Sequence, residues 1–206
     1  MFLRLGIAPN LLVAAGVRRV TDLDARELYG IRFHGDLTGI VFPYFHPFNG
    51  HRSTARLRRD NPETNSEGRP ENRYICPWGN ARHLYFAPGV CELLSDVTVP
   101  VVFVDAEKSV LAITALAARH GRRILAIGTG GCWGWRGKTG IEPGPNGERG
   151  ETRGPLPDFG PFVLEGRKVL LLSGANVASN QRVRDARRAL VEALAGWGAI
   201  VADPGK

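Results

Sequence analysis

A continuous run of apolar residues, Val101-Val102-Phe103-Val104, most restricts the fold that this chain can adopt. Such a run, rich in β-branched residues, is typical of a strand that is buried on both faces of a sheet. The pattern after it predicts further elements, with helices at residues 107–120 and 181–195 and strands at residues 124–127, 169–172 and 199–202. Strands and helices in this order form a parallel α/β sheet with helices packed across it.

The first 99 residues have a different pattern, which predicts a small, basic α+β unit ahead of the parallel sheet. Short elements are expected there, with helices at residues 9–15 and 24–29 and strands at residues 39–43, 53–57, 74–75 and 84–86. Residues 58–72 are polar and contain proline and glycine, so we expect a mobile loop. We therefore expect two domains, residues 1–99 and 100–206, the second with a long loop between residues 128 and 162.

The composition limits the class of protein. Hydrophobic residues make up 43% of the 206 positions, and no apolar run is long enough to cross a bilayer, so we expect a soluble, cytoplasmic protein. Cys76, Cys91 and Cys132 are odd in number and scattered, which argues against a disulfide framework and a zinc site. The net charge of +7 indicates an anionic partner, although a basic surface without a specific ligand gives the same charge.

Two acidic residues follow the first strand of the expected sheet. In open parallel sheets, ligands bind beyond the carboxyl ends of the strands, and Asp105 and Glu107 stand there, at the start of a helix. Two carboxylates in this place bind a hard cation such as Mg²⁺, or they complement the positive end of the helix dipole. The residues alone leave both alternatives open.

The stretch from Val102 to Ser109 resembles the first motif of the TOPRIM family, in which an apolar strand is followed by glutamate, glycine and a helix. The stretch from Leu171 to Val177 is similar to the end of the family's third strand, where an Asp-x-Asp pair holds magnesium. This resemblance implies a TOPRIM-like fold in which Asp105 and Glu107 are the catalytic acids. It also implies that Asp105 and Asn176 contact a magnesium ion.

The chain departs from the TOPRIM pattern at the residues that matter for catalysis. Asp105 stands in place of the glutamate and Ala106 in place of the glycine, while Gly174 and Asn176 stand in place of the two aspartates. A divalent ion in a phosphoryl-transfer site needs anionic oxygens. We therefore expect weak magnesium binding and little or no nucleotidyl transfer.

The first half of the chain also resembles a known domain. The apolar strand at residues 39–43, the Asn49-Gly50 turn, an arginine-rich strand and the apolar pieces at residues 73–75 and 84–85 are similar to the basic subdomain that precedes TOPRIM in bacterial replicative primases. The whole chain resembles the uncharacterised TOPRIM-like domains of phage and plasmid primase-helicase proteins, and residues 131–136 are especially similar to those domains.

Basic and aromatic residues indicate a groove for single-stranded nucleic acid. Alternate residues of a strand share a face, so we expect Arg52, Arg56 and Arg58 to form a stripe near aromatic side chains. A solvated sheet face is the alternative. The further residues expected to bind nucleic acid are Lys108, Trp133, Trp135 and Arg136.

Two other basic features are expected to have no such role. The arginines of the helix at residues 181–195 are assigned to its outer face. Residues 132–139 nearly match a phosphate-binding P-loop, but the prolines that follow prevent the helix that such a loop requires.

Three functions remain open from the sequence. The first is a primase-like nucleic-acid-binding protein of mobile-element origin, with its catalytic acids partly lost. The second is an active metal-dependent TOPRIM nucleotidyltransferase or nuclease, with Glu107, Asp158 or Asp203 compensating for the lost acids. The third is a non-enzymatic domain that binds a helicase or another replication protein. Because no helicase sequence follows the last strand, we expect an accessory or truncated protein.

Overall fold

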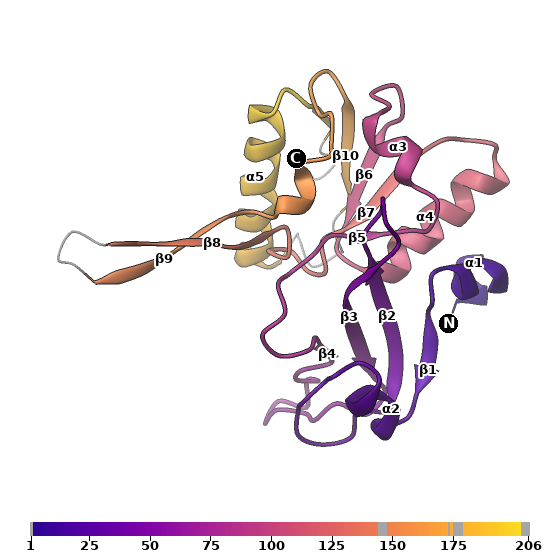
Figure 1. Ribbon diagram of the computed structural model, residues 1–206, viewed down its shortest axis with the longest axis vertical. Coiled ribbons are helices and arrows are strands. Elements are labelled where there is room, and N and C mark those ends of the chain that lie inside the picture. The colour runs from indigo at the N-terminus through magenta and orange to yellow at the C-terminus, as the bar shows by residue number, and fades with distance from the viewer. Residues whose placement is uncertain (1, 144–147, 173, 175–178, 203–206) are drawn as a thin grey trace. The chain divides into compact units, whose positions relative to one another are not determined.

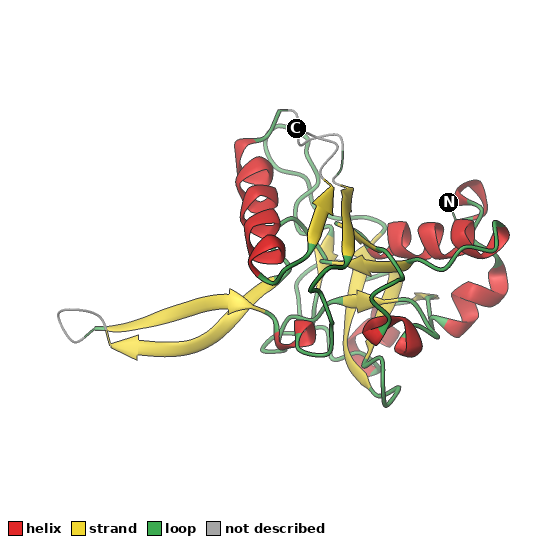
Figure 2. Cartoon of the chain, turned by 90° about the horizontal axis from the view of Figure 1, so that it is seen from above, coloured by secondary structure: helices red, strands yellow, loops and turns green. Residues whose placement is uncertain are grey.

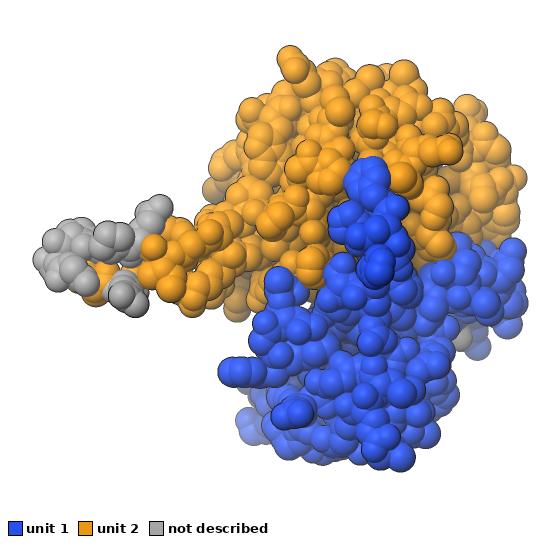
Figure 3. Space-filling view, in the orientation of Figure 1, with its two compact units in different colours: residues 1–81 blue, residues 82–206 orange. Residues whose placement is uncertain are grey.

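The computed structural model describes residues 2–143, 148–172, 174 and 179–202. The chain divides into two compact units, residues 1–81 (unit 1) and residues 82–206 (unit 2), shown in blue and orange in Figure 3. The division falls ahead of the boundary expected at residue 99, because β5 (Tyr85–Phe86) pairs with β7 (Leu125–Gly128) in unit 2. Among the described residues, no helix has the length and apolar character of a membrane span.

Unit 1 is built around an antiparallel sheet with the strand order β1-β2-β3-β4 (Figure 1). Its strands are β1 (Arg18–Val20), β2 (Gly39–Phe45), β3 (Arg52–Arg59) and β4 (Tyr74–Ile75). A short 3-10 helix, η1 (Leu3–Leu5), and two short helices, α1 (Pro9–Ala14) and α2 (Asp22–Glu27), accompany the sheet. The expected turn between β2 and β3 contains Gly50, whose φ of 68° is one that other residues rarely adopt.

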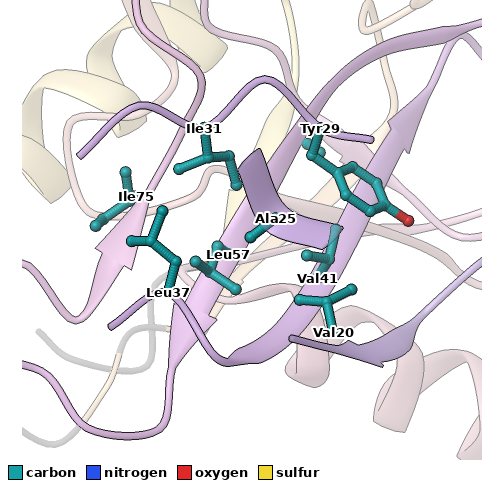
Figure 4. Packing of buried hydrophobic residues seen from close by; sticks show 9 residues of the cluster. Val20, Ala25, Tyr29, Ile31, Leu37, Val41, Leu57 and Ile75 are labelled. Atoms are coloured by element: carbon teal, nitrogen blue, oxygen red, sulfur yellow. The ribbon is translucent and has the colours of Figure 1, made fainter. Parts of the chain in front are cut away.

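The core of unit 1 lies between α2 and one face of the sheet. A capping box starts α2, because the Thr21 hydroxyl accepts from the Asp24 amide and the Asp24 carboxylate accepts from the Thr21 amide. Nine buried side chains form the cluster, shown in Figure 4: Val20, Ala25, Tyr29, Ile31, Leu37, Val41, Ala55, Leu57 and Ile75. Tyr29 lies at the edge of this cluster, and its phenol oxygen points away from the other side chains (Figure 4).

The loop expected at residues 58–72 begins after Arg59, and hydrogen bonds of polar side chains hold it in place. β3 continues to Arg59, whose fully buried guanidinium donates to the Asp36 carbonyl at 2.8 Å and to both carboxylate oxygens of Glu63. The Asn65 side chain accepts from the Glu67 amide at 3.0 Å. These contacts come from polar side chains, so the sequence has no periodic pattern of apolar residues that would indicate them. Composition alone therefore predicted a mobile loop.

Unit 2 contains a sheet with the strand order β11-β10-β6-β7-β5. In it, β6 (Val101–Val104), β7, β10 (Lys168–Leu172) and β11 (Ile200–Ala202) run parallel, and β5 pairs antiparallel with β7. The expected α/β class with a mostly parallel sheet is therefore confirmed.

Helices α4 (Glu107–Arg119) and α5 (Gln181–Gly196) cover opposite faces of this sheet (Figures 1 and 2). Right-handed crossovers from β6 to β7 and from β10 to β11 require this, because the two connections leave the centre of the sheet in opposite directions. Apolar stripes of the two helices face the sheet, and their buried residues are Val110, Leu111, Ala115 and Ala117 of α4 and Val183, Ala186, Leu190 and Leu194 of α5.

A buried arginine fixes the entry into β10. Arg167 is fully buried and donates to the carbonyls of Val99, Leu94 and Leu93 at 2.8, 2.6 and 2.5 Å. Two of these carbonyls belong to α3 (Cys91–Ser95), where a positive charge also complements the helix dipole. The side chain thereby joins α3 and the start of β6 to the start of β10.

The expectation of one long loop between residues 128 and 162 is wrong. This segment contains an antiparallel hairpin, β8 (Arg136–Pro143) and β9 (Arg149–Pro155), followed by a 3-10 turn, η2 (Pro157–Phe159). Figure 2 shows the hairpin extending away from the rest of unit 2. The strands are rich in glycine and polar residues, so they lack the apolar alternation by which a sequence indicates a strand.

The Arg59–Glu63 contact predicts a specific dependence of stability on pH. The hydrogen bond from Arg59 lowers the pKa of the Glu63 carboxyl from 4.5 to about 2. A carboxyl whose pKa is lower in the folded state than in the unfolded state stabilises the fold at pH values above its unfolded-state pKa. This stabilisation is lost as the pH falls through the folded-state pKa. The free energy of unfolding, measured in urea, should therefore fall more steeply between about pH 5 and about pH 2 in the wild type than in Glu63→Gln.

Glu67→Gln is the matched control, because the Glu67 carboxylate pairs with Arg69 while both side chains are largely exposed. This variant should keep the wild-type slope. If the free energy of unfolding falls with pH equally steeply in the wild type and in Glu63→Gln, Glu63 does not make the described contact with Arg59.

Candidate functional site

The central strands of unit 2 meet at a topological switch point. From β6 the chain passes through α4 to β7 on one side, and from β10 it passes through α5 to β11 on the other, while β6 and β10 pair directly. In open α/β sheets, the crevice beyond the carboxyl ends of two such strands is the usual place for a ligand.

A small pocket lies at this crevice, which we call the switch-point pocket. Residues from the ends of β6, β7 and β10 and from one face of α5 line it: Phe103, Val104, Asp105, Thr129, Cys132, Leu171, Leu172, Val183, Arg187 and Leu190. Among these described residues, Asp105 is the one carboxylate and Arg187 the one cation. The pocket thus combines an apolar floor with one charge of each sign.

Asp105 holds the loops of the pocket together. Its carboxylate accepts from the backbone amide of Gly174 at 3.1 Å, and its carbonyl accepts from the Gly131 amide at 2.8 Å. The Thr129 hydroxyl donates to the Gly131 carbonyl at 2.9 Å, which closes the turn after β7. Asp105 and Gly174, which the sequence places at the ends of neighbouring strands, are therefore brought together, while Asn176 lies outside the described residues.

Glu107 has different surroundings from Asp105. It lies in the first turn of α4 and is 1% exposed. Burial, and secondarily the negative charge of Glu107, raise the pKa of the Tyr85 phenol on β5. Because β5 and β10 lie on opposite sides of β6, the two expected catalytic acids face different parts of the sheet. Lys108, the next residue, is half-buried.

The described residues contain no group of three or more side chains able to hold a metal ion. Asp158, considered as a compensating acid, accepts from the Leu84 amide at 2.5 Å and pairs with His83 Nδ1 at 3.1 Å. Asp203 lies outside the described residues. Asp105 is therefore the acid that this part of the chain offers to a cation at the switch point.

Arg187 belongs to the inner face of α5, contrary to the outer-face assignment of the arginines of this helix. It follows Val183 by four residues and precedes Leu190 by three, so it continues the apolar stripe that lines the pocket. Side chains on a helix lean toward its amino terminus, and α5 begins at the carboxyl edge of the sheet. The Arg187 side chain therefore leans toward that edge. The helical spacing of residues 183, 187, 190 and 194 could have placed Arg187 on the inner face. An arginine in an apolar stripe is usually assigned to the surface, so it was missed in the sequence.

Trp133, Trp135 and Arg136 form one cluster at the base of the hairpin. The Arg136 guanidinium lies 5.8 Å from the Trp133 ring centre and 5.4 Å from that of Trp135, and it donates to the Arg153 carbonyl at 2.7 Å. Trp135 is 2% exposed, so in this conformation its ring is closed to a nucleic-acid base, whereas Trp133 is half-buried. The strand β8 follows directly, which confirms that the P-loop match lacks its helix.

The expected stripe of Arg52, Arg56 and Arg58 is wrong for Arg52. Between Tyr44 and Phe45 the pairing of β2 with β3 shifts by one residue, which is a β-bulge. Arg56 lies 4.5 Å from the Tyr74 ring centre, and Tyr74 pairs with Arg58 on the same face. Arg52 instead lies 4.8 Å from the ring centre of the core residue Tyr29, on the other face. Without the bulge, alternation would have kept all three together.

Comparisons of this chain with models of protein families, with curated proteins and with solved structures found no match. Its function is therefore inferred from the geometry of the chain itself.

The turn that carries Cys132 and Trp133 has a strict requirement for glycine. A Cβ on Gly134 would lie 1.7 Å from the Thr129 carbonyl oxygen, so Gly134→Ala forces the turn to move. We expect a loss of about 2 kcal/mol or more in the free energy of unfolding and a changed tryptophan emission spectrum, both measured by fluorescence in urea. Gly196→Ala is the control, since nothing lies within 4 Å of its added Cβ, and alanine at this helical position should stabilise by roughly 0.5 kcal/mol. A neutral Gly134→Ala would show that the turn is not packed as described.

Proposed function

We propose that this chain is a primase-like nucleic-acid-binding protein of the TOPRIM type, of mobile-element origin, whose metal-binding acids are partly lost. Its partners in this proposal are single-stranded DNA or nucleotides, and a helicase or another replication protein, in the cytoplasm. The observation that carries the proposal is the hydrogen bond between the Asp105 carboxylate and the Gly174 amide at the switch point.

This contact supports the TOPRIM resemblance because of the residues that it joins. The family motif requires an acid after the first strand of the sheet and an acidic pair after the third, and Asp105 and Gly174 occupy the first position of each. A carboxylate at position 174 would therefore stand beside Asp105. With glycine there, the described pocket offers a cation one carboxylate, whereas tight Mg²⁺ sites in proteins use several oxygen ligands.

The charges of the pocket fit a phosphate better than they fit a metal ion alone. Arg187 brings a guanidinium to the same lining as Asp105. Guanidinium groups bind phosphate oxygens through paired hydrogen bonds, and a weakly held Mg²⁺ at Asp105 would bridge to the same phosphate. The pocket thus retains the phosphate-binding half of a phosphoryl-transfer site, with nucleotidyl transfer impaired by the missing acids.

Restoring one acid tests this proposal by gain of function. In calorimetric titration the wild type should bind Mg²⁺ weakly, and Gly174→Asp should strengthen binding by about tenfold or more, because it adds an anionic ligand beside Asp105. Gly196→Asp is the matched control. It adds the same charge at the end of α5, which lies at the amino edge of the sheet, and should leave the affinity unchanged.

Two results would contradict the proposal. Tight binding by the wild type at neutral pH would mean that the acids of the site are elsewhere. Equal, weak binding by Gly174→Asp and Gly196→Asp would mean that position 174 does not face a cation site.

A further inference from the structure

An open groove lies in unit 1, on the face of the sheet that also carries the core. It has a volume of about 520 Å³, is largely open to solvent, and is lined by Gly16, Arg18, Tyr29, Pro43, Phe45 and Arg52. A volume of this size is in the range of small-molecule sites. We call it the Tyr29 groove.

Two arginines are fixed over one aromatic ring in this groove. The guanidinium carbons of Arg18 and Arg52 lie 5.3 and 4.8 Å from the centre of the Tyr29 ring. Arg52 also donates to the Leu28 carbonyl at 3.1 Å, which fixes its direction. Both side chains belong to exposed residues. The ring attracts each cation, but it also gathers two like charges, and an anion between them would relieve their repulsion.

Four other arginines of unit 1 are paired with carboxylates. These pairs are Arg19–Asp60, Arg26–Asp22, Arg59–Glu63 and Arg69–Glu67. Within the part of the chain that the structure describes, Arg18 and Arg52 form no ion pair. The charge of Arg18 interacts with Asp24, but the Asp24 carboxylate also accepts from the Thr21 amide and hydroxyl in the capping box. The groove therefore gathers, at one aromatic ring, two guanidinium groups that form no salt bridge within the described residues.

The rest of the lining consists of rings and glycine. Gly16 has a φ of +63°, and a Cβ there would lie 3.2 Å from Pro43 Cγ and 3.3 Å from the Phe45 ring. Its bare backbone therefore packs directly against both rings, and a larger residue would be strained and would crowd them. The half-buried Phe45 and the buried Pro43 add an aromatic ring and an apolar ring to the lining that contains the two arginines.

We propose that the Tyr29 groove binds a nucleoside phosphate, with the phosphate on Arg18 and Arg52 and the base against Pro43 and Phe45. Two guanidinium groups suit the several oxygens of a phosphate better than a single carboxylate, and a flat base suits an aromatic surface. The ligand is a free nucleotide or one nucleotide unit of a single strand. This site is separate from the switch-point pocket and does not depend on a metal ion.

The test uses the full chain with two probes, thymidine 5′-monophosphate and a short oligothymidylate, each titrated by calorimetry at fixed salt. Arg18→Ala should weaken binding by about tenfold, and Arg18→Ala/Arg52→Ala by more, because each arginine supplies charge-assisted hydrogen bonds to phosphate. Arg19→Ala is the matched control. Arg19 is the neighbouring residue of β1, points to the opposite face and pairs with Asp60, so its loss should change binding by less than about twofold.

The single Arg18 variant guards against misfolding, because the Arg18 side chain makes no hydrogen bond within the described residues, whereas the Arg52 side chain does. Weakened binding of both probes supports recognition of the nucleotide unit, and weakened binding of the oligothymidylate alone supports a strand as the ligand. Binding of both probes by Arg18→Ala within twofold of the wild type, or absence of binding by the wild type, overturns the proposal. Magnesium affinity should be unchanged in these variants, which separates failure here from failure at Asp105.

Discussion

The direct pairing of β6 with β10 is the constraint on which the rest of unit 2 depends. Because the chain leaves these two strands in opposite directions, their carboxyl ends border a common crevice, and the two helices must cover opposite faces. The hydrogen bond from the Gly174 amide to Asp105 ties the two strand ends together there. α5 then brings Arg187 to the same pocket. The site is thus a consequence of strand order, and its chemistry depends on which side chains occupy the strand ends.

The sequence predicted the parts of the fold that are held by apolar burial. The strands β6, β7 and β10 and the helices α4 and α5 were found within one or two residues of their bounds, because each has an apolar run or stripe. The hairpin β8–β9 has neither, and it was missed. The candidate site residues could likewise be placed only where an apolar pattern positions them. Asp105 could be placed from the strand that precedes it, whereas the face of Arg52 depends on a β-bulge that the sequence does not signal.

The arginines show why net charge is a poor guide to function. Arg59 and Arg167 are fully buried and hold loops and strand ends through carbonyl and carboxylate oxygens. Others are paired with acids on the surface. Positive charge lines the two candidate sites locally, at Arg187 in unit 2 and at Arg18 and Arg52 in unit 1. The proposed nucleic-acid partner would bind at these places, and the net charge of +7 adds only a general attraction.

The account stands on the proposal that Asp105 is the anionic ligand for a cation at the carboxyl edge of the sheet, and manganese located by anomalous scattering in soaked crystals tests it most directly. We predict a partly occupied manganese peak in contact with the Asp105 carboxylate, close to the Gly174 amide, at manganese concentrations on the order of millimolar. A fully occupied ion held by several carboxylates at another place in the chain would contradict the account. So would crystals at the same concentration with no manganese at Asp105.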